Sequence, residues 1–341
     1  MPPARPRTAL LGAIVLVALP GLATGGVRLP GATASDLAAP WDVMGYVEPG
    51  AGAGAAIDAN RGAVTSVGMD ESSVTANGSG ITAPDRSWVR RIHAVGAKAE
   101  FLVSNWSNQS NGFSAALAAD VLQTAGHRDS VAQAIASDVV EGGWDGVTID
   151  FESIRRADRA DLVTFVAGVR ARLPRRAILV VDIPASSSAS DPHLAPFDDR
   201  GLARHADELM LMAYDQHYPG GPAGPVAGLA WVKASLGVAL RSVPPSELQL
   251  GEAGYGYRWY PDGRATSVGD AQARRIAARN GVHPTWSAAR GEWHATLPDR
   301  SVLWWSDARA QALDTAVAAQ AHLRGIGVWQ LVQSDPLPPL G

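Results

Sequence analysis

The stretch that decides the fold is Trp144-Asp145-Gly146-Val147-Thr148-Ile149-Asp150-Phe151-Glu152. It alternates as a β-strand does, so Val147, Ile149 and Phe151 point to one face. The opposite face ends in Asp150 and Glu152, about 7 Å apart by the rise of two strand residues. Because a packed core does not accept ionised groups without a reason, this pair indicates a functional site. The alternative is an edge strand whose acids simply face water.

The residues that follow favour a site. Residues 153–158 lead directly into an amphipathic helix whose apolar stripe runs from Leu162 to Leu173. Asp150 and Glu152 therefore lie at the carboxyl end of a strand that feeds a helix. In α/β folds, active sites lie at that end of the strands.

Similar strand patterns recur along the chain and alternate with helical ones. The expected strands are 43–47, 63–68, 99–104, 144–152, 177–183, 208–214, 248–251 and 325–331. Helices are expected after Pro84, from a cap at Ser130, over 229–243, and from a cap at Ser306 to Leu323. Eight such units predict an α/β fold, a (β/α)8 TIM barrel over residues 41–341 with no second hydrophobic core. Four tryptophans within 282–305 predict a small β insertion over the barrel mouth: Trp286, Trp293, Trp304 and Trp305.

Composition narrows the function classes. The chain has 341 residues, of which 46% are hydrophobic and 18% charged, so it can easily bury a core. A net charge of −4 gives no electrostatic footprint for nucleic acid. The absence of cysteine excludes disulfides, thiolate metal sites and a cysteine nucleophile. The eight histidines show no metal-ligand spacing, and no cofactor is expected.

The N-terminus predicts export. Arg5 and Arg7 precede an apolar run over 9–19, which is short for a bilayer span but typical of a signal peptide. We therefore interpret residues 1–25 as a signal peptide or an uncleaved N-terminal anchor, and 26–40 as a linker. Small residues at 23–25 and at 32–34 offer two cleavage sites. The expected location is secreted, in the cell wall, or anchored to the membrane at the N-terminus.

A second constellation of polar residues ends the expected sixth strand. Met212-Ala213-Tyr214-Asp215-Gln216-His217 can aim a phenol and a carboxylate into one pocket, although such a pair alone is more often structural. On the expected last strand, Trp329 is either a core aromatic or part of a binding surface.

Together these stretches resemble glycoside hydrolase family 18, the chitinases and their relatives. Residues 145–152 are similar to the family's D-G-x-D-x-D-x-E motif, with Thr148 in place of the middle aspartate. Residues 212–215 match its M-x-Y-D motif, and 220–227 resemble a loop of the branch that includes spore-cortex and cell-wall N-acetylglucosaminidases. The resemblance extends from about Trp41 to Pro336.

The resemblance implies a role for each candidate residue. Glu152 would be the general acid, Asp150 would orient and stabilise the sugar's acetamide, and Tyr214 and Asp215 would hold it. Trp329 would form the floor of the sugar subsite. Further substrate-binding candidates are Tyr46, Gln216 and Asn105, the last of which could equally serve a turn.

The positions of the two acids on the expected strand agree with these roles. An ordinary retaining glycosidase has two carboxylates on opposite sides of the scissile bond, about 5 Å apart. Asp150 and Glu152 share one face of one strand, so they cannot flank a sugar. This favours substrate assistance, in which the sugar's 2-acetamido carbonyl attacks the anomeric carbon.

Three functions therefore compete. The first is an exported N-acetylglucosaminidase for peptidoglycan or a chitin-like polymer, and the second is a sugar-binding lectin that kept the barrel but lost activity. The third is a glycosidase for another acetylated exopolysaccharide. The presence of the expected general acid, Glu152, argues against the lectin. Thr148, in place of the motif's middle aspartate, keeps that alternative open. The expected partner is an N-acetylated polysaccharide, with the protein acting as a monomer.

Overall fold

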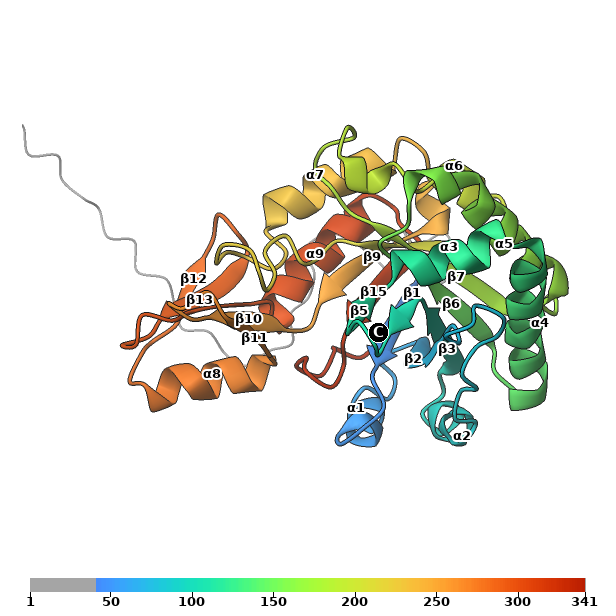
Figure 1. Ribbon diagram of the computed structural model, residues 1–341. Coiled ribbons are helices and arrows are strands. Elements are labelled where there is room, and N and C mark those ends of the chain that lie inside the picture. Colours follow the sequence, from blue (N-terminus) through green and yellow to red (C-terminus); the bar gives the residue numbers. More distant parts are fainter. Residues whose placement is uncertain (1–40, 341) are drawn as a thin grey trace, which may run out of the picture. The chain divides into compact units, whose positions relative to one another are not determined.

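The computed structural model describes residues 41–340, and within this range eight parallel strands close a barrel (Figure 1). Around the barrel each strand pairs with the next one along the chain, and β15 closes against β1. The strands are β1 (Asp42–Val47), β2 (Ser66–Ser73), β3 (Lys98–Ser104), β6 (Gly146–Asp150), β7 (Ile178–Pro184), β8 (Glu208–Met212), β9 (Leu248–Ala253) and β15 (Gly325–Trp329). The predicted barrel is confirmed.

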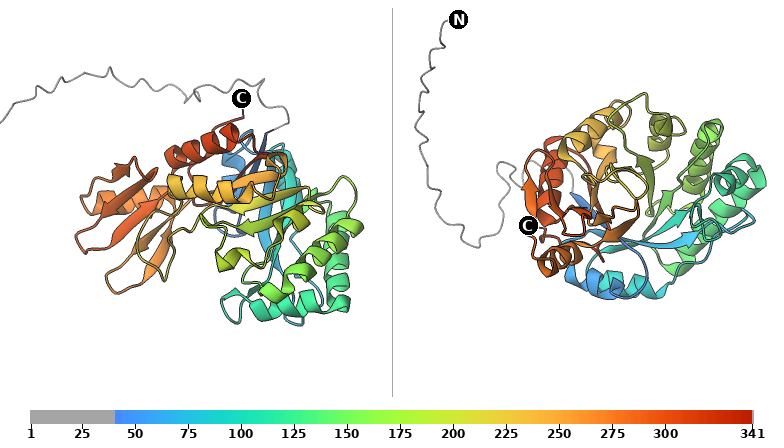
Figure 2. Two further views of the ribbon diagram at one scale, coloured as in Figure 1. Left: turned by 90° about the horizontal axis from the view of Figure 1, so that it is seen from above. Right: turned by 60° about the vertical axis from the view of Figure 1, so that its left-hand side comes forward.

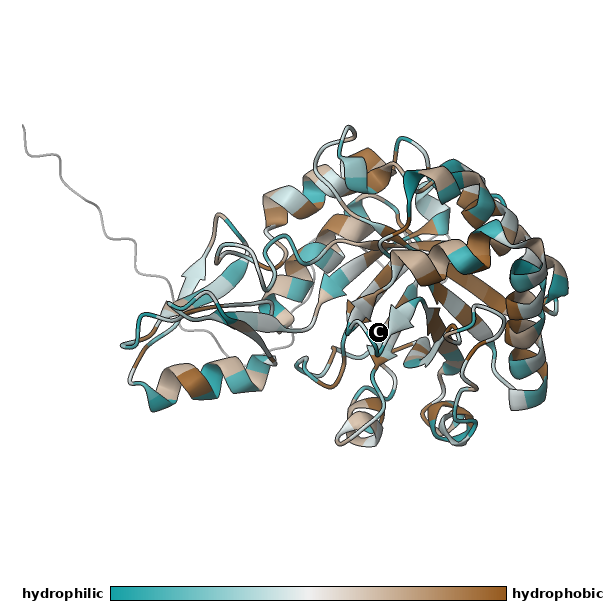
Figure 3. Cartoon of the chain, in the orientation of Figure 1, coloured by the Kyte–Doolittle hydropathy of each residue, from teal (hydrophilic) through white to brown (hydrophobic). Residues whose placement is uncertain are grey.

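Helices surround the strands, as the right-hand view of Figure 2 shows. They are α1 (Ala53–Ala59), α2 (Ser87–Ala94), α3 (Ala115–Gln123), α4 (Ala125–Gly142), α5 (Arg159–Arg172), α6 (Asp199–Ala203), α7 (Leu229–Ala239) and α9 (Ala308–Gln320). Strand β7 is largely brown in Figure 3, as expected for a strand that is buried on both faces. Val147, Ile149 and Phe151 pack in the layer between strands and helices, as predicted.

Several boundaries differ from the sequence predictions. Helix α4 begins at Ala125, so Ser130 lies inside it rather than capping it. The last helix is capped by Asp307, whose carboxylate accepts a hydrogen bond from the Arg309 amide at 3.0 Å; Ser306 lies one position too early. Helices α1 and α3 were not predicted, because alanine-rich segments carry no strong apolar stripe.

The insertion between β9 and α9 is larger than predicted and begins near Gly256 rather than at 282. Five antiparallel strands lie in the order β11-β10-β14-β13-β12, and helix α8 (Asp270–Arg279) packs against the sheet. The strands are β10 (Gly256–Trp259), β11 (Ala265–Val268), β12 (Thr285–Ser287), β13 (Glu292–Thr296) and β14 (Val302–Trp305). Contrary to the sequence prediction, a small second core centred on Trp305 and Leu303 lies between this sheet and α8.

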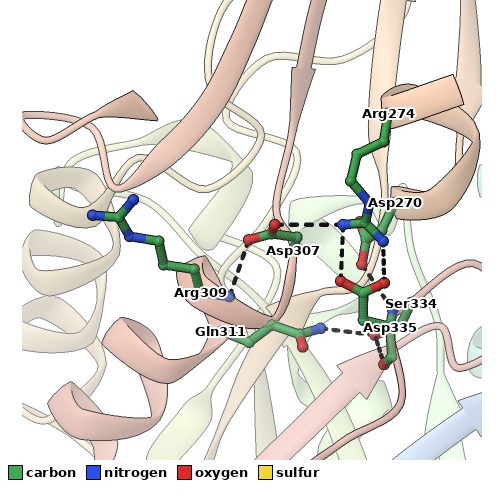
Figure 4. A network of polar contacts seen from close by, with 7 residues as sticks. All are labelled: Asp270, Arg274, Asp307, Arg309, Gln311, Ser334 and Asp335. Carbon is green, nitrogen blue, oxygen red and sulfur yellow. Dashed lines mark hydrogen bonds and ion pairs between the residues drawn. The ribbon is translucent and has the colours of Figure 1, made fainter. Parts of the chain in front are cut away.

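A polar network fastens the insertion to the end of the chain (Figure 4). Arg274 on α8 pairs with Asp335 after β15 and reaches Asp307 at 3.5 Å. Asp270 accepts a hydrogen bond from the Asp335 backbone amide at 2.8 Å. These contacts fix α8, the start of α9 and the segment after β15 relative to one another.

Within residues 41–340, the structure contains no helix that is both long enough and apolar enough to span a membrane. The expected signal peptide or anchor over 1–25 and the linker over 26–40 lie outside the described residues.

Candidate active site

A cleft of about 720 Å³ opens at the carboxyl ends of the barrel strands. The final residues of five strands line it: Ser73 of β2, Ser104 of β3, Asp150 of β6, Met212 of β8 and Trp329 of β15. Tyr255 and Tyr257, at the start of the insertion, line it from another side. The site therefore lies where the strand-to-helix order predicts it.

Asp150 and Glu152 both line this cleft. Asp150 is only 7% exposed, and its Oδ1 has no hydrogen-bond partner among the described residues. Burial, followed by the charge of Glu152, raises the pKa of Asp150. Burial also raises the pKa of Glu152, to about 7, and the charge of Asp215 contributes. On the opposite face, Phe151 stacks on Phe165 of α5 with ring centres 5.3 Å apart, which anchors the segment between the two acids.

The backbone of Glu152 is held by Asn105. The Asn105 Oδ1 accepts from the Glu152 amide at 2.8 Å, and its Nδ2 donates to the Glu152 carbonyl at 2.8 Å. Nδ2 also donates to the Ser114 carbonyl at 3.1 Å. Asn105 is fully buried, so it lies beneath the cleft and not on its surface, where a sugar contact was expected. Asn108 lines the cleft instead.

We expect Asn105→Ala to lower both stability and turnover. The substitution leaves two buried backbone groups of Glu152 without partners, at about 1–3 kcal/mol each. A displaced Glu152 should lower kcat more than it raises KM. Thermal unfolding and steady-state kinetics test this, with Asn108→Ala as the matched control on the cleft surface. An unchanged kcat in a folded Asn105→Ala protein would contradict the positioning role.

Tyr214 and Asp215 also line the cleft. Asp215 has a left-handed backbone, with φ of 57°, which aspartate tolerates better than most residues. Its Oδ1 accepts hydrogen bonds from the hydroxyls of Tyr255 at 2.6 Å and Tyr257 at 2.9 Å. Neither tyrosine was predicted as a site residue, although the alternating aromatics of Tyr255-Gly256-Tyr257-Arg258-Trp259 were a signal for them.

A third inner carboxylate, Asp182 of β7, was also missed. Ile149 pairs with Val181, so Asp182 lies beside Asp150 on the neighbouring strand. Asp182 lines the cleft but is only 4% exposed, and burial, followed by the charge of Glu152, raises its pKa. Thr148, at the position of the motif's middle aspartate, is fully buried below this level.

The remaining candidates lie at different depths. Trp329 lines the cleft, and Tyr46 packs against it with ring centres 5.7 Å apart. Tyr46 is 2% exposed, lies outside the set of lining residues, and donates to Asp182 at 3.4 Å. Gln216 is also outside that set, since its Oε1 accepts from the Gly228 amide at 3.1 Å and so holds the loop after β8. Both residues were expected to bind substrate.

Comparisons with known proteins agree on one family. The model described as "Glycosyl hydrolases family 18" matches residues 86–334. The "Putative sporulation-specific glycosylase YdhD" of Bacillus subtilis (strain 168) is 27% identical over 256 residues, which are 72% of this chain and 59% of that protein. The chain thus spans about three fifths of this relative's length.

Two solved structures share the fold. The spore cortex-lytic enzyme SleL of Bacillus cereus superposes with a TM-score of 0.79 at 20% identity, over 86% of this chain and 71% of that one. A chitinase from Chromobacterium violaceum gives 0.80 at 24% identity, over 86% of this chain and 95% of that one.

Proposed function

Because the chain belongs to glycoside hydrolase family 18, and so to the glycosidases, we propose that it cleaves β-linked N-acetylglucosamine polymers by substrate-assisted catalysis. The observation that carries the proposal is the meeting of Asp150, Glu152 and Tyr214 in one cleft beside Trp329. The names of the relatives, a cortex-lytic enzyme and a chitinase, support polymers of this class as substrates.

The placement of the acids supports the mechanism. Asp150 and Glu152 are two residues apart at the end of one strand, so they reach the sugar from the same side. Asp182 lies beside Asp150 on the neighbouring strand β7, so it reaches the sugar from the same side and does not supply an opposing nucleophile either. An attacking group must then come from the substrate, and the 2-acetamido carbonyl is suitably placed for this.

Each residue then has a defined role. Glu152 protonates the leaving oxygen and afterwards deprotonates water, as general acid and then base. Asp150, whose Oδ1 has no partner within residues 41–340, orients the acetamide and stabilises charge on its nitrogen. Tyr214 donates a hydrogen bond to the acetamide, Asp215 contacts the sugar, and Trp329 stacks under the ring.

The pH dependence should report the general acid. Glu152 must be protonated in the free enzyme and its pKa is about 7, so kcat/KM should fall as the pH rises through about 7. Asp215 contributes to that raised pKa, so removing its charge in Asp215→Asn should move the basic limb to lower pH. Profiles of kcat/KM against pH for both proteins measure this. If the basic limb of Asp215→Asn stays where it is in the wild-type protein, Asp215 does not raise the pKa of Glu152.

A substrate panel tests the function directly. Purified protein is incubated with peptidoglycan, chitin oligomers and partly deacetylated poly-N-acetylglucosamine, and the masses of the products are determined by mass spectrometry. We expect products that end in N-acetylglucosamine at the new reducing end. Binding without cleavage of any of the three would instead favour the lectin.

We also propose that the protein is exported. The proposal rests on Arg5, Arg7 and the apolar run over 9–19. N-terminal sequencing of protein from the culture medium should begin between about Gly25 and Ser35. Recovery only of the full-length chain in membranes would favour an anchor.

A further inference from the structure

We propose that the cleft contains a subsite for a sugar with a free ammonium group, formed by Glu48, Asp70 and Glu71. These three residues are called the acidic edge below. The substrate would then be a partly deacetylated polymer, in which a glucosamine lies next to the N-acetylglucosamine that is cleaved. This inference rests on the proposed function and specifies its substrate.

The first observation is the charge of the cleft. Four carboxyl residues of the proposed catalytic centre line it, and the acidic edge adds three more. Among the described residues that line the cleft, none is Lys, Arg or His. In residues 41–340, no ion pair involves a member of the acidic edge. A cationic group is therefore the missing complement.

The second observation places the acidic edge beside the sugar floor. Glu48 directly follows β1, while Asp70 and Glu71 belong to β2. Strand β1 lies between β2 and β15, the strand that ends in Trp329. Gln330, the next residue, donates from its Nε2 to Glu48 Oε2 at 2.6 Å. Glu48 is thus held in place by the residue that directly follows Trp329.

Gln330 also points to a polar ligand. Its side chain lines the cleft and it is only 4% exposed, yet its Oε1 has no hydrogen-bond partner among the described residues. A buried amide oxygen without a partner is costly, and an N–H group would satisfy it. An ammonium group has three N–H donors, enough to serve this oxygen and two carboxylates.

The pKa values of the acidic edge agree with a cationic ligand. Burial and then the charge of Glu48 raise the pKa of Asp70 to about 6. Burial raises the pKa of Glu71 to about 7, although the Asp85 amide hydrogen bond opposes this. Their surroundings therefore disfavour the ionised carboxylates, and a bound cation would stabilise them. The same charges would disfavour a sugar that carries its own carboxylate, as half of the sugars in peptidoglycan do.

The ammonium sugar cannot occupy the position that is cleaved. Substrate assistance needs an acetamide there, so the free amine must lie at a neighbouring subsite. The preferred pattern is a glucosamine followed or preceded by an N-acetylglucosamine. Fully acetylated polymer would be a poorer substrate because the acidic edge then faces a neutral amide.

The test compares matched oligomers. Chitin oligomers and poly-N-acetylglucosamine oligomers are each used fully acetylated and partly deacetylated, and the preference is the ratio of kcat/KM. We expect the wild-type protein to prefer the partly deacetylated form by about 10–100-fold, as for hydrogen bonds to charged groups. Re-acetylation of the oligomers should abolish the preference, and added salt should weaken it.

Variants locate the effect. Glu48→Gln and Glu71→Gln should each reduce the ratio, and the triple variant with Asp70→Asn should bring it close to one. Glu141→Gln, at the end of α4 that leads into the opposite end of the barrel, removes one exposed carboxylate and should leave the ratio unchanged. A wild-type ratio near one, or a preference that survives Glu48→Gln and Glu71→Gln, would overturn the acidic edge.

Binding separates this inference from the proposed function. The affinities of Glu152→Gln for both forms of the oligomer are measured by calorimetry, which needs no turnover. Tighter binding of the partly deacetylated form supports the acidic edge even if the wild-type protein cleaves neither polymer. Equal affinity overturns it even if both are cleaved.

Discussion

Glu152→Gln should lower kcat by about 10²- to 10⁴-fold, the usual contribution of a general acid. Glutamine has nearly the same shape, but its amide cannot donate a proton to the leaving oxygen. The Asn105 hydrogen bonds join the backbone of residue 152 and would remain. Sugar affinity should therefore change little, and turnover should be lost without unfolding.

The stability of this variant has a definite sign. A carboxyl group whose folded-state pKa is raised stabilises the fold below its unfolded pKa, and that stabilisation is lost as the pH rises through the folded value. For Glu152 this loss runs from about pH 4.5, its ordinary pKa, to about pH 7, so at neutral pH a glutamine, which stays uncharged, should not destabilise the protein. Thermal unfolding at neutral pH measures this.

The leaving group provides an internal control. A substrate with a good leaving group, such as a nitrophenolate, needs little protonation of that group. The fall in kcat from the wild-type protein to Glu152→Gln should therefore be much smaller for this substrate than for a natural oligomer. Glu141→Gln is the matched control, because it makes the same substitution far from the cleft. If Glu152→Gln cleaves the natural oligomer at the wild-type rate, Glu152 is not the general acid.

The sequence predicted the barrel because its strands are encoded locally. Segment 177–183 is almost entirely apolar and became β7, and segment 144–152 supplied both β6 and the two acids. What local patterns do not contain is the partner of each residue across the barrel. Asp182 looked like a single polar residue in an apolar run, and only the pairing of β6 with β7 places it beside Asp150.

The same limit explains the misplaced site residues. Asn105 and Gln216 are polar residues just beyond strand ends, where either a sugar or a backbone group can be the partner. In the structure their amides serve Glu152 and Gly228. Likewise, Tyr255 and Tyr257 follow β9, far along the chain from Asp215, and no spacing rule links them to it.

Substrate assistance should be visible in inhibitor binding. If the acetamide is the nucleophile, a thiazoline analogue of the cyclised intermediate should bind about 10²-fold or more tighter than free N-acetylglucosamine, because such sites prefer mimics of the reacting state. Calorimetry or competition kinetics measures the difference. Equal binding of the two would mean that the site does not recognise the cyclised form.

Two variants separate the contributions of the neighbouring groups. Asp150→Asn should weaken thiazoline binding strongly, because the carboxylate stabilises positive charge on the ring nitrogen. Tyr214→Phe should weaken it less, since it removes one hydrogen bond worth about 1 kcal/mol. The reverse order would mean that the phenol, and not the carboxylate, stabilises the intermediate.

The chemistry of the cleaved sugar gives the strictest test, and it distinguishes the catalytic subsite from the acidic edge. A free amine has no carbonyl to attack the anomeric carbon, so an oligomer should not be cleaved on the reducing side of a glucosamine, even though a glucosamine at the neighbouring subsite should assist. Sequencing the products of a partly deacetylated oligomer by mass spectrometry reveals both positions at once. Efficient cleavage after glucosamine, or a covalent sugar trapped on Asp150, Asp182 or Glu152, would show that a carboxylate of the protein is the nucleophile. In that case acids from one strand end, or from the neighbouring ends of β6 and β7, would reach opposite sides of the bond, contrary to the geometry of these strands.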